Sequence, residues 1–301
     1  NVVSLAAVLI AGCDDVGNSP SDTNLARSKP IYDIQGHAVD GLIKNGDVRV
    51  YDFSEGVKGS ILGVGKTDSY GVFDASITGL SAANGSYILS CVVSGSYTEE
   101  ASGMSISLQD GQELCAVKFF NPNSDFSVVI NGWSHLSVGY AEFLVSQGSA
   151  IENAVDRANT ALASASGFDI LSTVPYDPTN SDYYGKPYDD SMKFGLAISG
   201  ISQYVLGIAI ENGLTRHTNI FSSISLWQTL FNDISSDGVI DGKGISQNGF
   251  TSIDLGMGVH QFDRDSLNLD LARSTIKFIQ SPANKAGITV STVLAEQERI
   301  A

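Results

Sequence analysis

The spacing of the apolar residues in this 301-residue chain changes near Gly132, and that change most constrains the fold. Before it, apolar and polar residues alternate, as in residues 47–53, 72–77 and 87–93. After it, apolar residues recur at every third or fourth position. Alternation is typical of half-buried strands, and the longer spacing is typical of amphipathic helices. The sequence therefore predicts a strand-rich part followed by a helical part.

Residues 31–131 are expected to form an antiparallel β-sandwich of short strands. The Asn45-Gly46 and Asn84-Gly85 pairs are strong turn signals, because both residue types tolerate a positive φ. Further strands are expected at residues 104–108, 113–120 and 126–130.

Residues 132–301 are expected to form an all-α domain, which makes the chain an α+β protein of two domains. The predicted helices cover residues 135–145, 150–165, 190–210, 220–234, 266–279 and 289–299. The stretch 194–210 carries no charge and contains Gly195, Gly200 and Gly207. It is short for a membrane span and holds several polar residues, so we expect a buried helix whose glycines let its neighbours approach closely.

A short apolar run from Val2 ends in Ile10-Ala11-Gly12-Cys13 and is followed at once by Asp14-Asp15. Small residues before a cysteine at the end of such a run resemble a bacterial lipobox. The resemblance implies that residues 1–12 are a signal segment and that Cys13 carries a lipid. The alternative is an ordinary buried cysteine after a core helix, but the polar sequence that follows suits a tether better than a core.

Residues 14–30 are polar, include two prolines, and cannot bury enough apolar surface to fold by themselves. Together with Cys13 they give an expected flexible tether, residues 13–30. These features predict a membrane-anchored lipoprotein of the bacterial cell envelope, on either the periplasmic or the surface face.

The charge balance narrows the class of partner. The chain has 17 basic and 33 acidic residues, a net charge of −16. Nucleic acid is a poor partner for such a chain, because its phosphates require Lys and Arg. Direct adhesion to anionic lipid is disfavoured for the same reason. The membrane is therefore expected as a partner only through the lipid on Cys13.

Cys91 and Cys115 remain as a pair if Cys13 is lipidated. Export to an oxidising compartment would permit a disulfide between them. Two buried free thiols are the alternative, since free cysteine is among the most buried residue types. The sequence leaves both open.

Several segments resemble a known family. They are Ile34-x-Gly36-x-Ala38-x-Asp40-Gly41, Val48-x-Val50-Tyr51-Asp52 and Thr67-Asp68-x-x-Gly71-x-Phe73, which look like the carboxypeptidase regulatory, or transthyretin-like, β-sandwich. The segments 95–103 and 133–144 resemble a continuation found in proteobacterial surface and secreted proteins, in which such a sandwich leads into a helical region.

The resemblance covers roughly residues 31–210 and implies a cell-envelope protein with a β-sandwich and a helical domain. That group is mostly uncharacterised, so the resemblance implies no reaction. A shared fold would not by itself indicate a function.

Asp233, Ser235, Asp237 and Asp241 are candidate ligands for Ca²⁺, with Gly238 at the position where a calcium loop turns sharply. The twelfth position of the loop holds a glycine instead of the bidentate Glu of an EF-hand. The alternative is an Asp-Gly turn that ends a helix. Apart from this candidate calcium, no cofactor is expected.

Tyr176, Tyr183, Tyr184 and Tyr188 lie in the long, proline-containing stretch 173–190. Tyrosines offer a large rigid surface and a hydroxyl group, which suits binding of a glycan or a peptide. The alternative is an ordered connector whose tyrosines fill gaps between packed elements. Long loops in compact domains are often functional.

No catalytic motif stands out. The histidines, which are His37, His135, His217 and His260, are scattered and match no metal or nucleophile pattern. The segment 63–67 resembles the end of a phosphate-binding loop, but it lacks the required spacing. A nucleophile and a base brought together by folding would leave no such trace.

These observations favour a lipid-anchored envelope protein that acts as a non-catalytic binding or structural module, with an envelope protein or a glycan as its partner. One alternative is a surface receptor for a glycan or peptide that uses residues 173–190. A second alternative is an envelope hydrolase.

Overall fold

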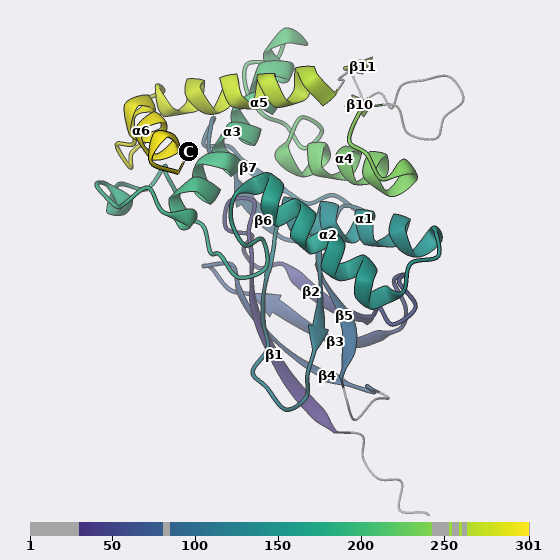
Figure 1. Cartoon of the computed structure of the whole chain (residues 1–301). Coiled ribbons are helices and arrows are strands. Elements are labelled where there is room, and N and C mark those ends of the chain that lie inside the picture. The colour runs from purple at the N-terminus through teal and green to yellow at the C-terminus, as the bar shows by residue number, and fades with distance from the viewer. Residues whose placement is uncertain (1–29, 81–84, 243–252, 255–258, 261–263, 301) are drawn as a thin grey trace, which may run out of the picture.

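The structure is a computed structural model, which describes residues 30–80, 85–242, 253–254, 259–260 and 264–300. Its strands curl into a barrel-like sheet, and its helices cover one side and one end of that sheet (Figure 1).

The elements follow the predicted division in outline, with the seven-stranded sheet first and the helices after it. The strands are β1 (Ile31–Ala38), β2 (Asp47–Asp52), β3 (Ile61–Thr67), β4 (Val72–Thr78), β5 (Ser86–Val92), β6 (Ser96–Thr98), β7 (Ser105–Ser107), β8 (Leu114–Phe120), β9 (Ser127–Ile130), β10 (Ile253–Asp254) and β11 (Val259–His260). The helices are α1 (Gly132–Ser146), α2 (Ile151–Ser166), α3 (Asp190–Glu211), α4 (Ser223–Asp237), α5 (Arg264–Ile279) and α6 (Val290–Ile300), with a 3-10 turn at Ser181–Tyr183. The prediction that residues 132–301 are all-α is wrong, because two short strands, Ile253–Asp254 and Val259–His260, pair with each other between α4 and α5.

Seven strands form one sheet in the order β8-β5-β2-β3-β4-β1-β9. All described neighbours in it are antiparallel except β1 and β9, which run parallel with Gln35 opposite Ser127 and Ala38 opposite Ile130. The two end strands also approach each other, because the Lys118 ammonium group of β8 donates to the Ser127 carbonyl of β9 at 2.8 Å. The sheet is therefore a nearly closed, mixed barrel.

The predicted antiparallel β-sandwich is thus wrong. One mixed sheet curls around a single apolar interior, instead of two sheets packing face to face. The alternating pattern indicates which residues face inward, but it does not say which strands pair. The parallel pair joins the first and last strands of the barrel, a long-range contact that no local pattern encodes. One apolar cluster continues from the barrel into the helices, and the division into two domains stays a prediction.

Strands β5 and β8 are buried on both faces. Their inward residues line the barrel, while Leu89, Cys91, Cys115 and Val117 point outward and pack with Val138 and other residues of α1 and α2. Cys91 and Cys115 lie opposite each other in the β5–β8 ladder and form a disulfide. The bond therefore lies beneath the helices that cover this side of the barrel.

Helix α3 begins at the first residue of the predicted range 190–210 and ends one residue beyond it. Asp189 is the N-cap, and its carboxylate accepts from the Met192 N–H at 3.0 Å. Asn212 is the C-cap, and Gly213 follows with a φ of +82°.

Helix α3 is the one described helix long and apolar enough to cross a membrane, by length and composition alone. Within its most apolar window, 72% is buried inside the protein. The expected close approach is confirmed at two of its glycines. A Cβ at Gly195 would collide with the Tyr176 carbonyl, and one at Gly200 would collide with Thr275 of α5. Gly207 has open space instead.

The junction between barrel and helices is a buried hydrogen-bonded cap. Asn131 is fully buried, and its Oδ1 accepts from the Ser134 N–H at 2.9 Å, while its Nδ2 donates to the Ile170 carbonyl at 2.7 Å. The Ser134 hydroxyl accepts from the Asn131 N–H at 2.9 Å and donates to the Cys115 carbonyl of β8 at 2.8 Å. Helix α1 is thereby fixed to the barrel at its first residue.

Replacing Asn131 with Ala is expected to lower the free energy of unfolding by about 2–3 kcal/mol, because a helix cap is lost and a buried carbonyl loses its donor. Urea denaturation would measure the change. The control is Asn123→Ala at an exposed turn, for which a change within about 0.5 kcal/mol is expected. Equal effects of the two substitutions would contradict the importance of the cap.

Candidate functional site

A pocket of about 490 Å³ lies among helices α1 to α5. It is lined by apolar side chains with few exceptions, and none of its described lining residues is charged. Pockets of roughly 300–1000 Å³ that hold small ligands typically have this apolar lining with a few polar groups. Its lining includes Trp133, Leu136, Tyr140, Trp227, Leu230 and Asn268.

Two tryptophans form the aromatic end of the pocket. The rings of Trp133 and Trp227 lie 4.7 Å apart, and Trp133 also meets the edges of Phe168 and Phe194. The indole N–H of Trp227 donates to Asp40 Oδ1 at 3.0 Å. Because the indole is held by a buried carboxyl group and by neighbouring rings, this wall of the pocket is rigid.

Another part of the pocket lining reaches solvent. Ala161 and Ala165 of α2, Val239 after α4, and Asn268 of α5 line the pocket and are exposed. A small molecule can therefore enter between these elements without passing through the core.

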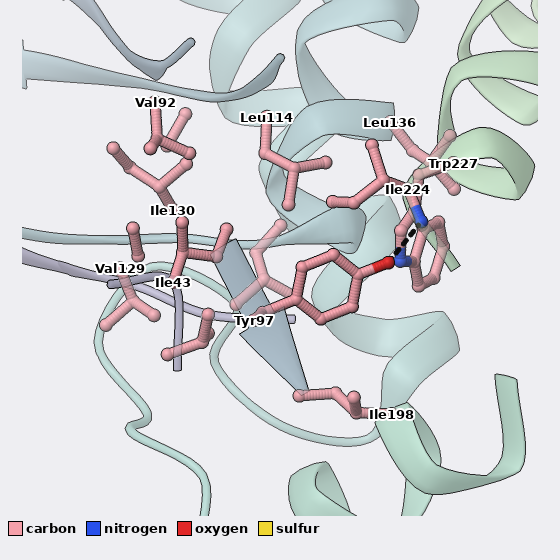
Figure 2. Packing of buried hydrophobic residues seen from close by; sticks show 14 of the residues in the cluster. Ile43, Val92, Tyr97, Leu114, Val129, Ile130, Leu136, Ile198, Ile224 and Trp227 are labelled. Atoms are coloured by element: carbon pink, nitrogen blue, oxygen red, sulfur yellow. Dashed lines mark hydrogen bonds between the residues drawn. The ribbon is translucent and has the colours of Figure 1, made fainter. Parts of the chain in front are cut away.

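Next to the tryptophans, a buried carboxylate holds the start of α4 against the hairpin formed by β6 and β7. Glu99 is fully buried, and its Oε1 accepts from the Tyr97 hydroxyl at 2.8 Å and from the Ser223 N–H at 2.7 Å. Its Oε2 accepts from the Ser223 hydroxyl at 2.7 Å. Tyr97 in turn accepts from the Ile224 N–H at 3.4 Å (Figure 2). A negative charge here also meets the positive end of the helix dipole.

The same carboxylate lies at the inner end of a chain of polar groups that leads to the surface. Nδ1 of His217 lies 2.6 Å from the Ser102 hydroxyl, while its Nε2 lies 2.9 Å from the Ser202 carbonyl and 3.4 Å from Glu99 Oε2. Both neighbours of Nε2 are acceptors, so in the neutral ring Nε2 carries the proton and Nδ1 accepts from Ser102. This arrangement can hold the elements together, and it can also take a proton from Ser102.

Two further carboxyl groups flank Glu99. Burial, reinforced by the charge of Glu99, raises the pKa of Asp40 and of Glu100 well above the usual range. Asp40 Oδ2 and Glu100 Oε2 are buried without a hydrogen-bond partner among the described residues, which suits neutral, protonated groups. Glu100 also lines a small cavity of about 30 Å³ beside Tyr176 and Gly195.

The tyrosine stretch is mostly packed against the protein. The rings of Tyr176 and Tyr183 stack at 4.8 Å, and both pack with Tyr188 against the cluster that contains Phe278 of α5. Tyr184 is 74% exposed. An open groove of about 1030 Å³ begins at Tyr188, but three of the four tyrosines help to hold α3 and α5 together. Glycan or peptide binding by this stretch stays a prediction.

The candidate calcium ligands are not arranged as one loop. Asp233, Ser235 and Asp237 lie within α4, which ends at the glycine that follows. One oxygen of Asp233 accepts from the N–H groups of Asp241 and Gly242, each at 2.9 Å, and so closes the turn after the helix. The described contacts match the alternative of an Asp-Gly turn, and calcium binding stays a prediction.

The cysteines and the remaining metal-type side chains complete the set of predicted site residues. Cys13 lies outside the described residues, so its lipidation stays a prediction. Among the described residues, one group of three metal-type side chains has ligand atoms within 4.8 Å of one another, namely Cys91, Glu113 and Cys115. Its two cysteines are bonded to each other.

Sequence reasoning missed both the apolar pocket and the Glu99–His217–Ser102 chain. The sequence predicts a helix over residues 135–145 and offers only a family resemblance over residues 95–103, and neither indicates these contacts. No protein-family model matches the chain, and no curated protein or solved structure matches it significantly. The function must therefore be argued from the residues of this chain.

Replacing Glu99 with Gln is expected to lower the free energy of unfolding by about 2–4 kcal/mol, because an amide presents donors where Tyr97 and Ser223 also donate. Chemical denaturation would measure the loss. The exposed Glu55→Gln is the matched control and should change stability by at most about 0.5 kcal/mol. Similar stability of the two variants would mean that Glu99 does not hold α4.

Replacing Glu100 with Gln tests the raised pKa of that group. The carboxyl group stabilises the fold fully below its ordinary pKa of 4.5, and that contribution is lost as the pH rises through the raised pKa. The variant should therefore gain stability relative to the natural protein between about pH 4 and about pH 8. Unfolding curves at both pH values would measure the difference, and a constant difference would contradict a raised pKa.

Proposed function

We propose that this protein is a lipid-anchored envelope binding protein whose helical part takes up a small apolar ligand in the pocket lined by Trp133 and Trp227. One observation carries the proposal: a pocket of about 490 Å³ with exposed lining residues, none of which is charged among the described residues. Well-formed apolar pockets with a few polar groups are the usual sites of ligand binding.

The lining defines the class of ligand. A charged group inside would lose its hydration without gaining a partner, which is costly. The Tyr140 hydroxyl and the Asn268 amide offer hydrogen bonds to one uncharged or terminal polar group. The ligand is therefore an acyl chain or a molecule of similar apolar character, with any charged head outside, near Asn268.

The arrangement of the elements supports this proposal. Strand β1 begins at the end of the barrel remote from the helices (Figure 1). An anchor at Cys13 would join the protein at that end, with the barrel as a spacer. The helices that line the pocket would then lie at the end of the protein away from the anchoring membrane, where a ligand can be received.

The intrinsic fluorescence of the protein offers a direct test. The chain has two tryptophans, and both line the pocket. We expect saturable changes in tryptophan emission when laurate or N-phenyl-1-naphthylamine is added to the full chain carrying Cys13→Ser, which needs no detergent. Ala161→Phe, at the mouth, should weaken binding by about tenfold or more, equivalent to about 1.4 kcal/mol.

Ser164→Phe is the matched control, since Ser164 is exposed on the same helix and does not line the pocket. This variant should bind like the parent. Emission that does not saturate, or an equal loss of binding in both variants, would contradict a ligand site in this pocket.

A further inference from the structure

Ser102 lies at the solvent end of an otherwise buried chain of polar groups. It belongs to the turn between β6 and β7 and is partly exposed, whereas His217 and Glu99 are 1% and 0% exposed. The adjacent Gly103 is exposed, with a φ of +67°, and a Cβ there would meet nothing within 4 Å. Ser102 therefore lies on a tight, partly exposed turn, where its Oγ also accepts from the Met104 N–H at 3.3 Å, while His217 and Glu99 are shielded from water.

The geometry behind Ser102 is that of a base held in one tautomer. A serine hydroxyl is a weak nucleophile until a neighbouring base takes its proton. Here Nδ1 of His217 lies 2.6 Å from that hydroxyl, and the proton on Nε2 is directed at the Ser202 carbonyl, 2.9 Å away. Glu99 lies at 3.4 Å on the same side and favours the imidazolium that forms when the proton arrives.

The two ring nitrogens have exchanged roles relative to the usual serine hydrolase arrangement, in which Nε2 faces the serine. Catalysis requires that the ring nitrogen facing the hydroxyl has a free lone pair and that the other ring nitrogen donates to an acceptor. Either ring nitrogen can face the hydroxyl. Glu99 is itself held by Tyr97 and Ser223, so it cannot turn away from the histidine.

We propose that Ser102 is the nucleophile of an acyl-transfer site, with His217 as its general base, Glu99 as a positioning residue and carboxylic esters as the substrate class. This activity goes beyond the proposed binding function and rests on different residues. Ser102 lies on a partly exposed turn, so the ester must present its carbonyl at the surface of the protein.

The reaction balances without a further reactant except water. Ser102 Oγ attacks the carbonyl carbon while Nδ1 of His217 takes the hydroxyl proton. The tetrahedral intermediate expels the alkoxide, which takes that proton and leaves as an alcohol. Water then attacks the acyl-serine and gives a proton to His217. The acyl–oxygen bond breaks, the carboxylic acid departs, and Ser102 Oγ recovers its proton.

A fluorophosphonate probe followed by peptide mass spectrometry tests the proposal on the full chain. We expect label on Ser102, none at this position in Ser102→Ala, and unchanged label in Ser105→Ala, whose serine is exposed on β7. His217→Asn, with an unchanged circular dichroism spectrum, should slow labelling by about 100-fold or more. A folded natural protein without label on Ser102, or equal rates with His217→Asn, would overturn the proposal.

A second variant keeps the test decisive if His217→Asn does not fold. Ser102→Cys places a thiol beside the imidazole of His217. This contact should raise the fraction of the thiol that is present as thiolate. Its reaction with iodoacetamide at neutral pH should be about tenfold faster than that of Ser105→Cys. Equal rates would overturn the proposal. Ala161→Phe should leave both reactions unchanged, so failure here is distinguishable from failure of the apolar pocket.

Discussion

The arrangement of this protein depends on one buried carboxylate. Glu99 joins the β6–β7 hairpin to the start of α4, and burying its charge is offset by three hydrogen-bond donors and by the helix dipole. Helix α4 carries Trp227 and Leu230 of the apolar pocket, and the hairpin carries Ser102. The apolar pocket and the partly exposed Ser102 are thus held by the same interaction, although they share no residue.

The helices could be predicted from the sequence because their signal is local. All six predicted helices are present, with limits that differ by a few residues. The strand pairing could not be predicted, because the parallel β1–β9 contact depends on closure of the barrel. Strand β3 was missed since Gly63 and Gly65 are poor strand formers. Both are needed there, because a Cβ at either position would collide with a carbonyl of β4.

The candidate sites, like the strand pairing, depend on long-range contacts that local sequence patterns do not encode. The tyrosine stretch and the acidic turn stand out by composition, yet Tyr176 and Tyr183 pack inward and Asp233 closes the end of a helix. Glu99 and His217 are unremarkable in the sequence, because their roles depend on neighbours far along the chain. Composition identifies residues that can bind, whereas burial and long-range contacts decide which of them are placed to do so.

The parallel pairing of β1 and β9 determines how late the barrel can close as the chain is made. In a chain that emerges from its N-terminus, β1 finds β4 early, but its second neighbour arrives only with residues 127–130. Until then β1 is an open edge, and such edges readily pair with other chains. Closure of the barrel and the start of α1 at Asn131 then follow within a few residues of each other. A nascent protein of this kind therefore needs protection for most of the time that its strands take to appear.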